Sequence, residues 1–146
     1  MQWKPHVTVA AVVEHERRFL IVEEAIGGRL VLNQPAGHLE EGETLQEAVV
    51  RETLEETGYR FTPEAVIGLY RWPSRERTYL RIVYTGRCSE PTTAPTLDGG
   101  IVRTLWLSEP ELSGQPQRLR SPLVMHAIRD YLGGRRYPLE LVHDIP

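Results

Sequence analysis

Short apolar runs, separated by glycine-rich turns and polar loops, mark the strands that the sequence predicts. Residues 7–13 read VTVAAVV without alternating polar positions, as expected of a strand buried on both faces. Gly27 and Gly28 lie between two further apolar segments, which is typical of two strands joined by a turn. We predict strands at residues 7–13, 19–22, 30–32, 65–72, 79–87 and 101–107. The polar segments 73–77 and 89–100 are predicted loops.

Local signals for helix ends predict a first helix in the middle of the chain. Thr44 followed three residues later by Glu47 has the spacing of a capping box, so the helix should begin at Leu45. Gly58 would lie just beyond the last turn, where a left-handed residue is favoured. We therefore predict a helix of more than three turns.

A second helix is predicted over residues 121–131. Ser121 and Pro122 suit its N-cap and first position, and the glycine pair 133–134 suits its end. Strands, a central helix, more strands and a final helix indicate an α/β (α+β) fold, with helices on the faces of a mixed β-sheet.

Composition and charge limit the class of protein. The 146 residues are 40 % hydrophobic and 25 % charged, which suits one globular domain over residues 1–146. A net charge of −3 argues against a nucleic-acid polymer as partner. The single cysteine, Cys88, excludes an intrachain disulfide and a cysteine-based zinc site. We expect a cytoplasmic protein, because no segment resembles a secretion signal or a membrane span.

The first predicted helix concentrates negative charge on one face. Glu52 lies three residues before Glu55 and four before Glu56, so the three carboxylates are neighbours on the helix surface. They repel one another and occupy the last turn, where the helix dipole disfavours anions. Val50 and Leu54 lie toward another side and are expected to anchor the helix to the sheet. On charge alone, the face is either a solvated acidic surface or a site for a divalent cation such as Mg²⁺.

The wider spacing of residues favours the cation site. Gly37, Glu43 and residues 51–59 (RETLEETGY) resemble the Nudix box, G-x5-E-x7-R-E-U-x-E-E-x-G-U, at every fixed position. Thr53 occupies the first U position, where a bulky aliphatic residue is usual. The resemblance implies the Nudix fold, an α/β/α sandwich with a mixed β-sheet, and hydrolysis of phosphoanhydrides.

Four further segments extend the likeness along nearly the whole chain. The segments WKPHVTVAAVV, NQPAGHLE, LRSPLV and RRYPLELV resemble the NudJ-type bacterial Nudix phosphatases. This resemblance implies release of orthophosphate from nucleoside tri- and diphosphates, and from hydroxymethylpyrimidine diphosphate and thiamine diphosphate. One alternative is a pyrophosphohydrolase that cuts ADP-ribose, nucleotide sugars or nucleoside triphosphates at the α-phosphorus. Another is a non-catalytic, nucleotide-sensing Nudix domain, although such a domain would be expected to have lost a residue of the box.

The resemblance also implies roles for the residues of the box. The expected cofactor is Mg²⁺, with Mn²⁺ as a substitute, and its expected ligands are Glu52, Glu55, Glu56 and the backbone carbonyl of Gly37. Arg51 completes the catalytic set and is expected to pair with Glu43. The metal would neutralise the phosphates and activate a water for in-line attack on phosphorus, without a covalent enzyme intermediate. The general base is either Glu55 or Asp98, the only acid in the segment LDGGI (97–101) at the start of the last predicted strand.

Candidate substrate contacts lie outside the box, and the expected partner is a small phosphoanhydride. Trp72 and Tyr70 are candidate stacking platforms, although their spacing on a strand equally fits core packing. Arg71 and Arg81 could clamp a phosphate, or pair with carboxylates on the surface. Gln34, in the NQPAGHLE run, is placed to hydrogen-bond a substrate. The expected state is a monomer or a homodimer.

Overall fold

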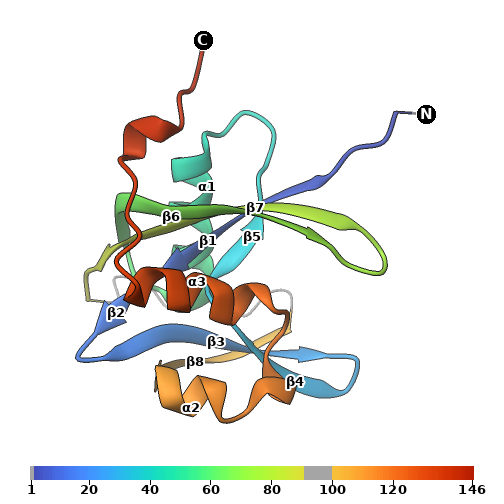
Figure 1. Ribbon diagram of the computed structural model, residues 1–146, viewed down its shortest axis with the longest axis vertical. Helices are drawn as coiled ribbons and strands as arrows, with labels where there is room; N and C mark the ends of the chain where they lie inside the picture. The colour runs from blue at the N-terminus through green and yellow to red at the C-terminus, as the bar shows by residue number, and fades with distance from the viewer. Residues whose placement is uncertain (1, 91–99) are drawn as a thin grey trace.

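The computed structural model describes residues 2–90 and 100–146, which form two four-stranded sheets and three α-helices (Figure 1). The strands are β1 (His6–Val12), β2 (Glu14–His15), β3 (Arg18–Ile26), β4 (Arg29–Asn33), β5 (Ala36–His38), β6 (Phe61–Pro73), β7 (Thr78–Cys88) and β8 (Ile101–Ser108). The helices are α1 (Leu45–Thr57), α2 (Glu109–Ser113) and α3 (Leu123–Leu132), with short 3₁₀ turns at Pro116–Arg118 and Leu139–Leu141. All six predicted strands and both predicted helices are present, whereas β2, β5 and α2 were not predicted.

The two sheets differ in how their strands pair. The first has the order β5-β1-β7-β6 and is mixed, because β1 and β7 are parallel and the other pairs are antiparallel. In the second sheet, β3 pairs antiparallel with β2, β4 and β8. The predicted class, a mixed α+β fold, is confirmed, but its strands are divided between two sheets rather than joined in one.

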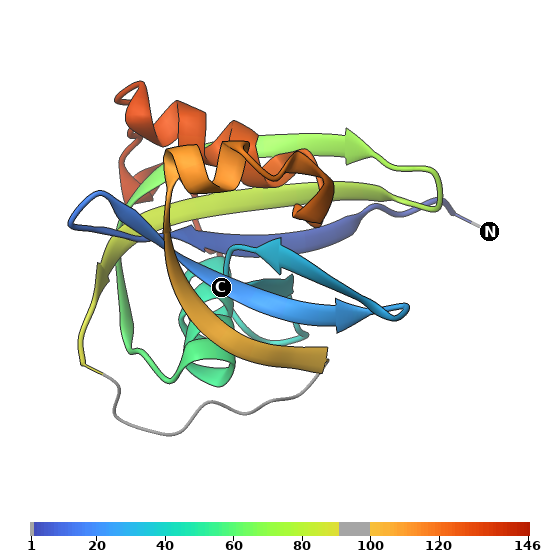
Figure 2. The ribbon, with the colours of Figure 1, turned by 90° about the horizontal axis from the view of Figure 1, so that it is seen from below.

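The central strand β1 separates two apolar cores. Ala10 and Val12 belong to a core that includes α3, whereas Val9 and Ala11 belong to a core that includes α1. All four side chains are fully buried because alternate residues of a strand point to opposite faces. The helices α1 and α3 therefore cover opposite sides of the strands, as Figure 2 shows, which is the layering of an α/β/α sandwich.

Helix α1 begins and ends as the sequence predicts. The Thr44 side chain accepts a hydrogen bond from the Glu47 amide (3.1 Å), and the Glu47 carboxylate accepts one from the Thr44 amide (2.8 Å). Gly58 has a φ of 78° and donates its amide to the Leu54 carbonyl. These bonds satisfy donors and acceptors at the helix ends that would otherwise lack partners.

The buried face of α1 includes one of the two predicted anchors, because Val50 is partly buried and packs against the apolar core. Ala48, Val49 and Thr53 are fully buried, whereas Val50 and Leu54 are only partly buried. The prediction of Leu54 as an anchor was wrong, because the side that meets the sheet runs through Val49 and Thr53. The Thr53 hydroxyl donates to the Val49 carbonyl (2.8 Å), so a polar residue is accommodated at this position.

Helix α3 starts two residues later than predicted. Pro122 is its N-cap, and the Ser121 hydroxyl accepts a hydrogen bond from the Leu123 amide (3.2 Å). Neither α3 nor any other helix within residues 2–90 and 100–146 has the length and apolar character that a membrane span requires.

Candidate active site

The short strand β5 brings two carboxylates of α1 against the backbone. The Ala36 amide donates to Glu56 Oε1 at 3.0 Å. At Gly37, an added Cβ atom would overlap the Glu52 carboxyl group, so this close approach of strand and helix requires glycine. The spacing between Gly37 and the carboxylates of α1 therefore has a structural basis in the contact between β5 and α1.

Arg51 is the hub of a hydrogen-bonded network beside these carboxylates. Its Nε and Nη2 atoms donate to the two oxygens of Glu43 at 3.0 and 2.8 Å, so the predicted pair is present and bidentate. Its Nη1 atom donates to Glu52 (2.8 Å) and Glu55 (3.3 Å), and Nη2 also donates to the His38 carbonyl (3.1 Å). The Arg51 guanidinium lowers the pKa of Glu43, while the Glu43 carboxylate raises that of Arg51. Arg51 thereby links the loop before α1 to two carboxylates on the helix.

Glu56 is in a different electrostatic environment. Burial raises its pKa to about 8, with smaller contributions from the charges of Glu52 and Glu24, and the Ala36 amide opposes the shift. Burial also raises the pKa of Glu52, against the effect of Arg51. Among the described residues, Glu56 forms no ion pair. It is therefore the carboxylate of the box whose charge a bound cation would compensate most.

Glu52, Glu56 and the backbone of Gly37 lie close enough together that they could hold a divalent cation. In the described part of the chain, no three His, Cys, Asp or Glu side chains form a ready ligand cage. Mg²⁺ does not need such a cage, because it keeps several waters and is bound through one or two carboxylates together with substrate phosphates. Glu56 and Glu52, together with the adjacent backbone of Gly37, match that requirement.

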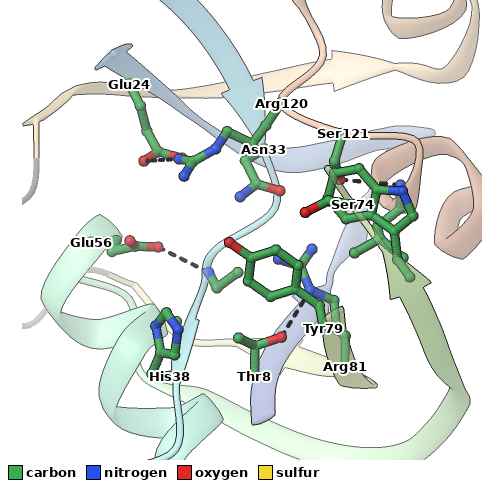
Figure 3. Close-up of a pocket in the computed structure, with 14 residues that line it drawn as sticks. Thr8, Glu24, Asn33, His38, Glu56, Ser74, Tyr79, Arg81, Arg120 and Ser121 are labelled. Atoms are coloured by element: carbon green, nitrogen blue, oxygen red, sulfur yellow. Dashed lines mark hydrogen bonds and ion pairs between the residues drawn. The ribbon is translucent and has the colours of Figure 1, made fainter. Parts of the chain in front are cut away.

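A cavity of about 320 Å³ opens beside Glu56. Glu24 and Glu56 lie on one side of it, with Glu24 Oε2 accepting a hydrogen bond from Arg120 Nη1 at 3.0 Å (Figure 3). Trp72 and Tyr79 also line the cavity, and their rings stack with centroids 5.7 Å apart and an angle of 17° between planes. The cavity therefore combines an acidic wall with an aromatic surface.

Two predicted substrate residues, Trp72 and Arg81, line this cavity. Arg71 does not, because neighbouring residues of β6 point to opposite faces and Arg71 is exposed on the outer one. The structure therefore does not bring Arg71 and Arg81 together at this cavity, as the clamp alternative requires.

Gln34 and Tyr70 also lie away from the cavity lining. Gln34 is 1 % exposed, and its amide donates to the Val124 carbonyl at 2.8 Å, so it links two elements of the core. Tyr70 packs against the α3 core and donates to Asp130 at 2.6 Å, which selects the core-packing alternative. Asp98 falls outside the described residues.

The sequence interpretation missed several residues that line the cavity: Glu24, Asn33, Tyr79 and Arg120. The carboxylate pair 23–24 at the end of an apolar strand was a detectable signal for Glu24. The position of Tyr79 depends on the pairing of β6 with β7, which places it opposite Trp72.

Comparison with known proteins gives consistent matches over most of the chain. A family model described as the NUDIX domain matches residues 4–126. The chain is 45 % identical to the phosphatase NudJ of Escherichia coli (strain K12), over 97 % of this chain and 93 % of that protein. A solved NUDIX hydrolase from Nitrosomonas europaea is 46 % identical, with a TM-score of 0.93 and coverage of 97 % of this chain and 98 % of the other. A MutT NUDIX hydrolase from Burkholderia pseudomallei, 18 % identical with a TM-score of 0.73, shares the fold over 88 % of this chain and 98 % of its own.

Proposed function

The chain belongs to the Nudix hydrolase family, whose members act on phosphoanhydrides, and we propose that it is a Mg²⁺-dependent phosphatase. Its proposed substrates are nucleoside tri- and diphosphates and the pyrimidine diphosphates hydroxymethylpyrimidine diphosphate and thiamine diphosphate, with orthophosphate as product. The name of the relative NudJ, a phosphatase, supports this choice. The observation that carries the metal-dependent chemistry is Glu56, a carboxylate facing the cavity without an ion-pair partner among the described residues.

Glu56 and Glu52, with the Gly37 carbonyl, would hold Mg²⁺, or Mn²⁺ in its place, and Glu55 would act from the exposed side of α1. The bound ion supplies Lewis-acid chemistry and lowers the pKa of a coordinated water. Arg51 holds Glu52 in place through its bond to the Glu52 carboxylate, while Glu43 fixes the orientation of Arg51.

We propose Glu55 as the general base. Its side chain is about half exposed, and its bond to Arg51 is the longest of those that Arg51 makes to the helix carboxylates. It can therefore turn toward a water without breaking the Arg51–Glu43 pair. Asp98 stands as the alternative base, because its loop lies outside the described residues.

A panel of substrates with separate analysis of products tests this function. Nucleoside diphosphates and triphosphates, thiamine diphosphate and ADP-ribose are incubated with enzyme in Mg²⁺ or in EDTA. We expect orthophosphate from the compounds with a terminal phosphate, no cleavage of ADP-ribose and no turnover in EDTA. Formation of pyrophosphate from triphosphates, or of AMP from ADP-ribose, would show that the enzyme is a pyrophosphohydrolase and not a phosphatase.

The matched variants are Glu56→Gln and Glu41→Gln. Glu41 is exposed in the loop before α1, so its replacement removes one negative charge of the same stretch without touching the proposed metal ligands. We expect Glu41→Gln to keep wild-type turnover and Glu56→Gln to lose at least a hundredfold in kcat while folding normally. Equal turnover by the two variants would overturn the metal assignment.

A further inference from the structure

Arg81 is a buried cation that forms no ion pair with any carboxylate of the described residues. It lies on β7, a central strand of the first sheet, and only 8 % of the residue is exposed. Its one hydrogen bond to a side chain joins Nε to the Thr8 hydroxyl at 3.4 Å, and its Nη1 atom has no partner among the described residues. Burial of an unpaired charge is costly, so a guanidinium in this position indicates an anion that arrives with a ligand.

The neighbouring charges do not neutralise Arg81. Arg120 lies on the same cavity, but its own charge is compensated by the 3.0 Å bond to Glu24. Neither Glu24 nor Glu56 is within ion-pair distance of Arg81. Burial, followed by the charge of Arg120, lowers the pKa of Arg81 to about 10, so the guanidinium stays protonated at neutral pH.

The position of Arg81 along the cavity suggests which anion it binds. In the view of Figure 3, its side chain lies behind Tyr79, with Glu56 on one side and Ser74 and Ser121 on the other. Arg81 lines the same cavity as Glu56, Trp72 and Tyr79, so a substrate bound there can reach its guanidinium. The cavity volume of about 320 Å³ is at the lower end for ligand sites, which favours a compact substrate.

We propose that, in diphosphate substrates, Arg81 binds the phosphate attached to the organic group and so sets the terminal phosphorus as the one attacked. This inference rests on the proposed phosphatase function. With that phosphate on Arg81 and the organic ring at Trp72 and Tyr79, the next phosphate along the chain lies at Glu56 and Gly37. The substrate class is then a diphosphate monoester of a compact aromatic group.

The chemical step is a balanced hydrolysis. The water oxygen bonds to the terminal phosphorus, and the bond from that phosphorus to the bridging oxygen breaks. The electron pair of the broken bond stays on the bridging oxygen, which departs as part of the organic monophosphate, and the water proton passes to the base. Arg81 retains the monophosphate and stabilises the negative charge that develops on it.

Binding of the monophosphate product without metal tests the inference separately from catalysis. Thiamine monophosphate and AMP are titrated calorimetrically into the protein in EDTA. We expect at least one of them to bind the wild type, and Arg81→Gln to weaken its binding about 10- to 100-fold, as loss of charge-assisted hydrogen bonds implies. Arg81→Lys should be intermediate, because it keeps the charge but not the planar fork.

Arg87→Gln is the matched control. Arg87 lies six residues further along β7, is exposed, and pairs with Glu64 outside this cavity. The Arg87→Gln variant should bind the monophosphate with the affinity of the wild type. Thermal unfolding in EDTA should show that Arg81→Gln is at least as stable as the wild type, because a desolvated charge has been removed.

Two results would overturn the inference, whatever the reaction proves to be. One is wild-type affinity for the monophosphate in folded Arg81→Gln or Arg81→Lys, and the other is no binding of either monophosphate by the wild type in EDTA. Glu56→Gln should keep this metal-free binding while it loses turnover. Failure of the phosphatase function would appear in the reaction products instead, since the binding measurement does not depend on turnover.

Discussion

Replacing Glu56 with glutamine should remove the pH dependence of stability that this carboxyl imposes on the metal-free protein. In the folded state its pKa is raised from 4.5 to about 8, chiefly by burial. Folding thus favours the protonated Glu56 carboxyl. Its contribution to the free energy of unfolding is fully present below pH 4.5 and is lost as the pH rises toward 8. Glutamine stays neutral and keeps an oxygen for the Ala36 amide, so the stability of the variant should not fall over this pH range for that reason.

The size of the effect follows from the same pKa shift. At 1.36 kcal/mol per pH unit, the limiting difference is about 5 kcal/mol, a large share of the stability of a small domain. Water penetration and rotation of the side chain reduce the desolvation cost, so we expect about 2–3 kcal/mol. Metal-free Glu56→Gln should exceed the wild type in stability by this amount above pH 8.

Urea unfolding in EDTA between pH 5 and 9 measures this difference. The two free energies of unfolding should converge at pH 5 and separate progressively up to pH 8. Both proteins should retain a smaller slope, because the pKa of Glu52 is also raised. Millimolar Mg²⁺ should then stabilise the wild type and leave the variant unchanged. Parallel curves for the two proteins would refute the assignment of Glu56 as a buried carboxyl that requires a cation.

Three further substitutions test the parts of the site. Gly37→Ala should lower kcat about a hundredfold, because the new Cβ displaces the Glu52 carboxyl group; Mg²⁺ titration should show weaker binding. Arg51→Gln should destabilise the protein by about 1–3 kcal/mol in urea unfolding, since it leaves the partly buried Glu43 unpaired. Trp72→Ala should raise KM about tenfold with a smaller change in kcat, as loss of a stacking surface predicts; unchanged steady-state kinetics would exclude Trp72 from the substrate site.

The elements that could be predicted from the sequence are those with strong local signals. The capping box of Thr44 and Glu47, and Gly58 at the other end, act within a few residues, so the bounds of α1 were correct. Strand β5 has no such signal, because a three-residue strand that contains glycine has no hydrophobic pattern. Its place is set by pairing with β1, and this pairing brings the backbone to Glu52 and Glu56.

In the candidate site too, the features set by neighbouring residues could be predicted, whereas those set by contacts between distant segments could not. Helical spacing was sufficient to place Glu52 and Glu56 on one face, because the period of a helix is fixed. The substrate contacts depend on which face of a strand each side chain occupies. Arg71 and Arg81 lie on neighbouring strands, yet Arg71 is exposed and Arg81 is buried without an ion pair in the part of the chain that the structure describes, a difference that only the sheet register reveals.

The position of isotopic oxygen in the products tests the central claim most directly. A nucleoside diphosphate is hydrolysed by the Mg²⁺-loaded enzyme in ¹⁸O-labelled water, and both products are analysed by mass spectrometry. Attack on the terminal phosphorus puts the label in orthophosphate and leaves the nucleoside monophosphate unlabelled, which is the result that we predict. Label in the nucleoside monophosphate would show attack at the α-phosphorus and would contradict the account.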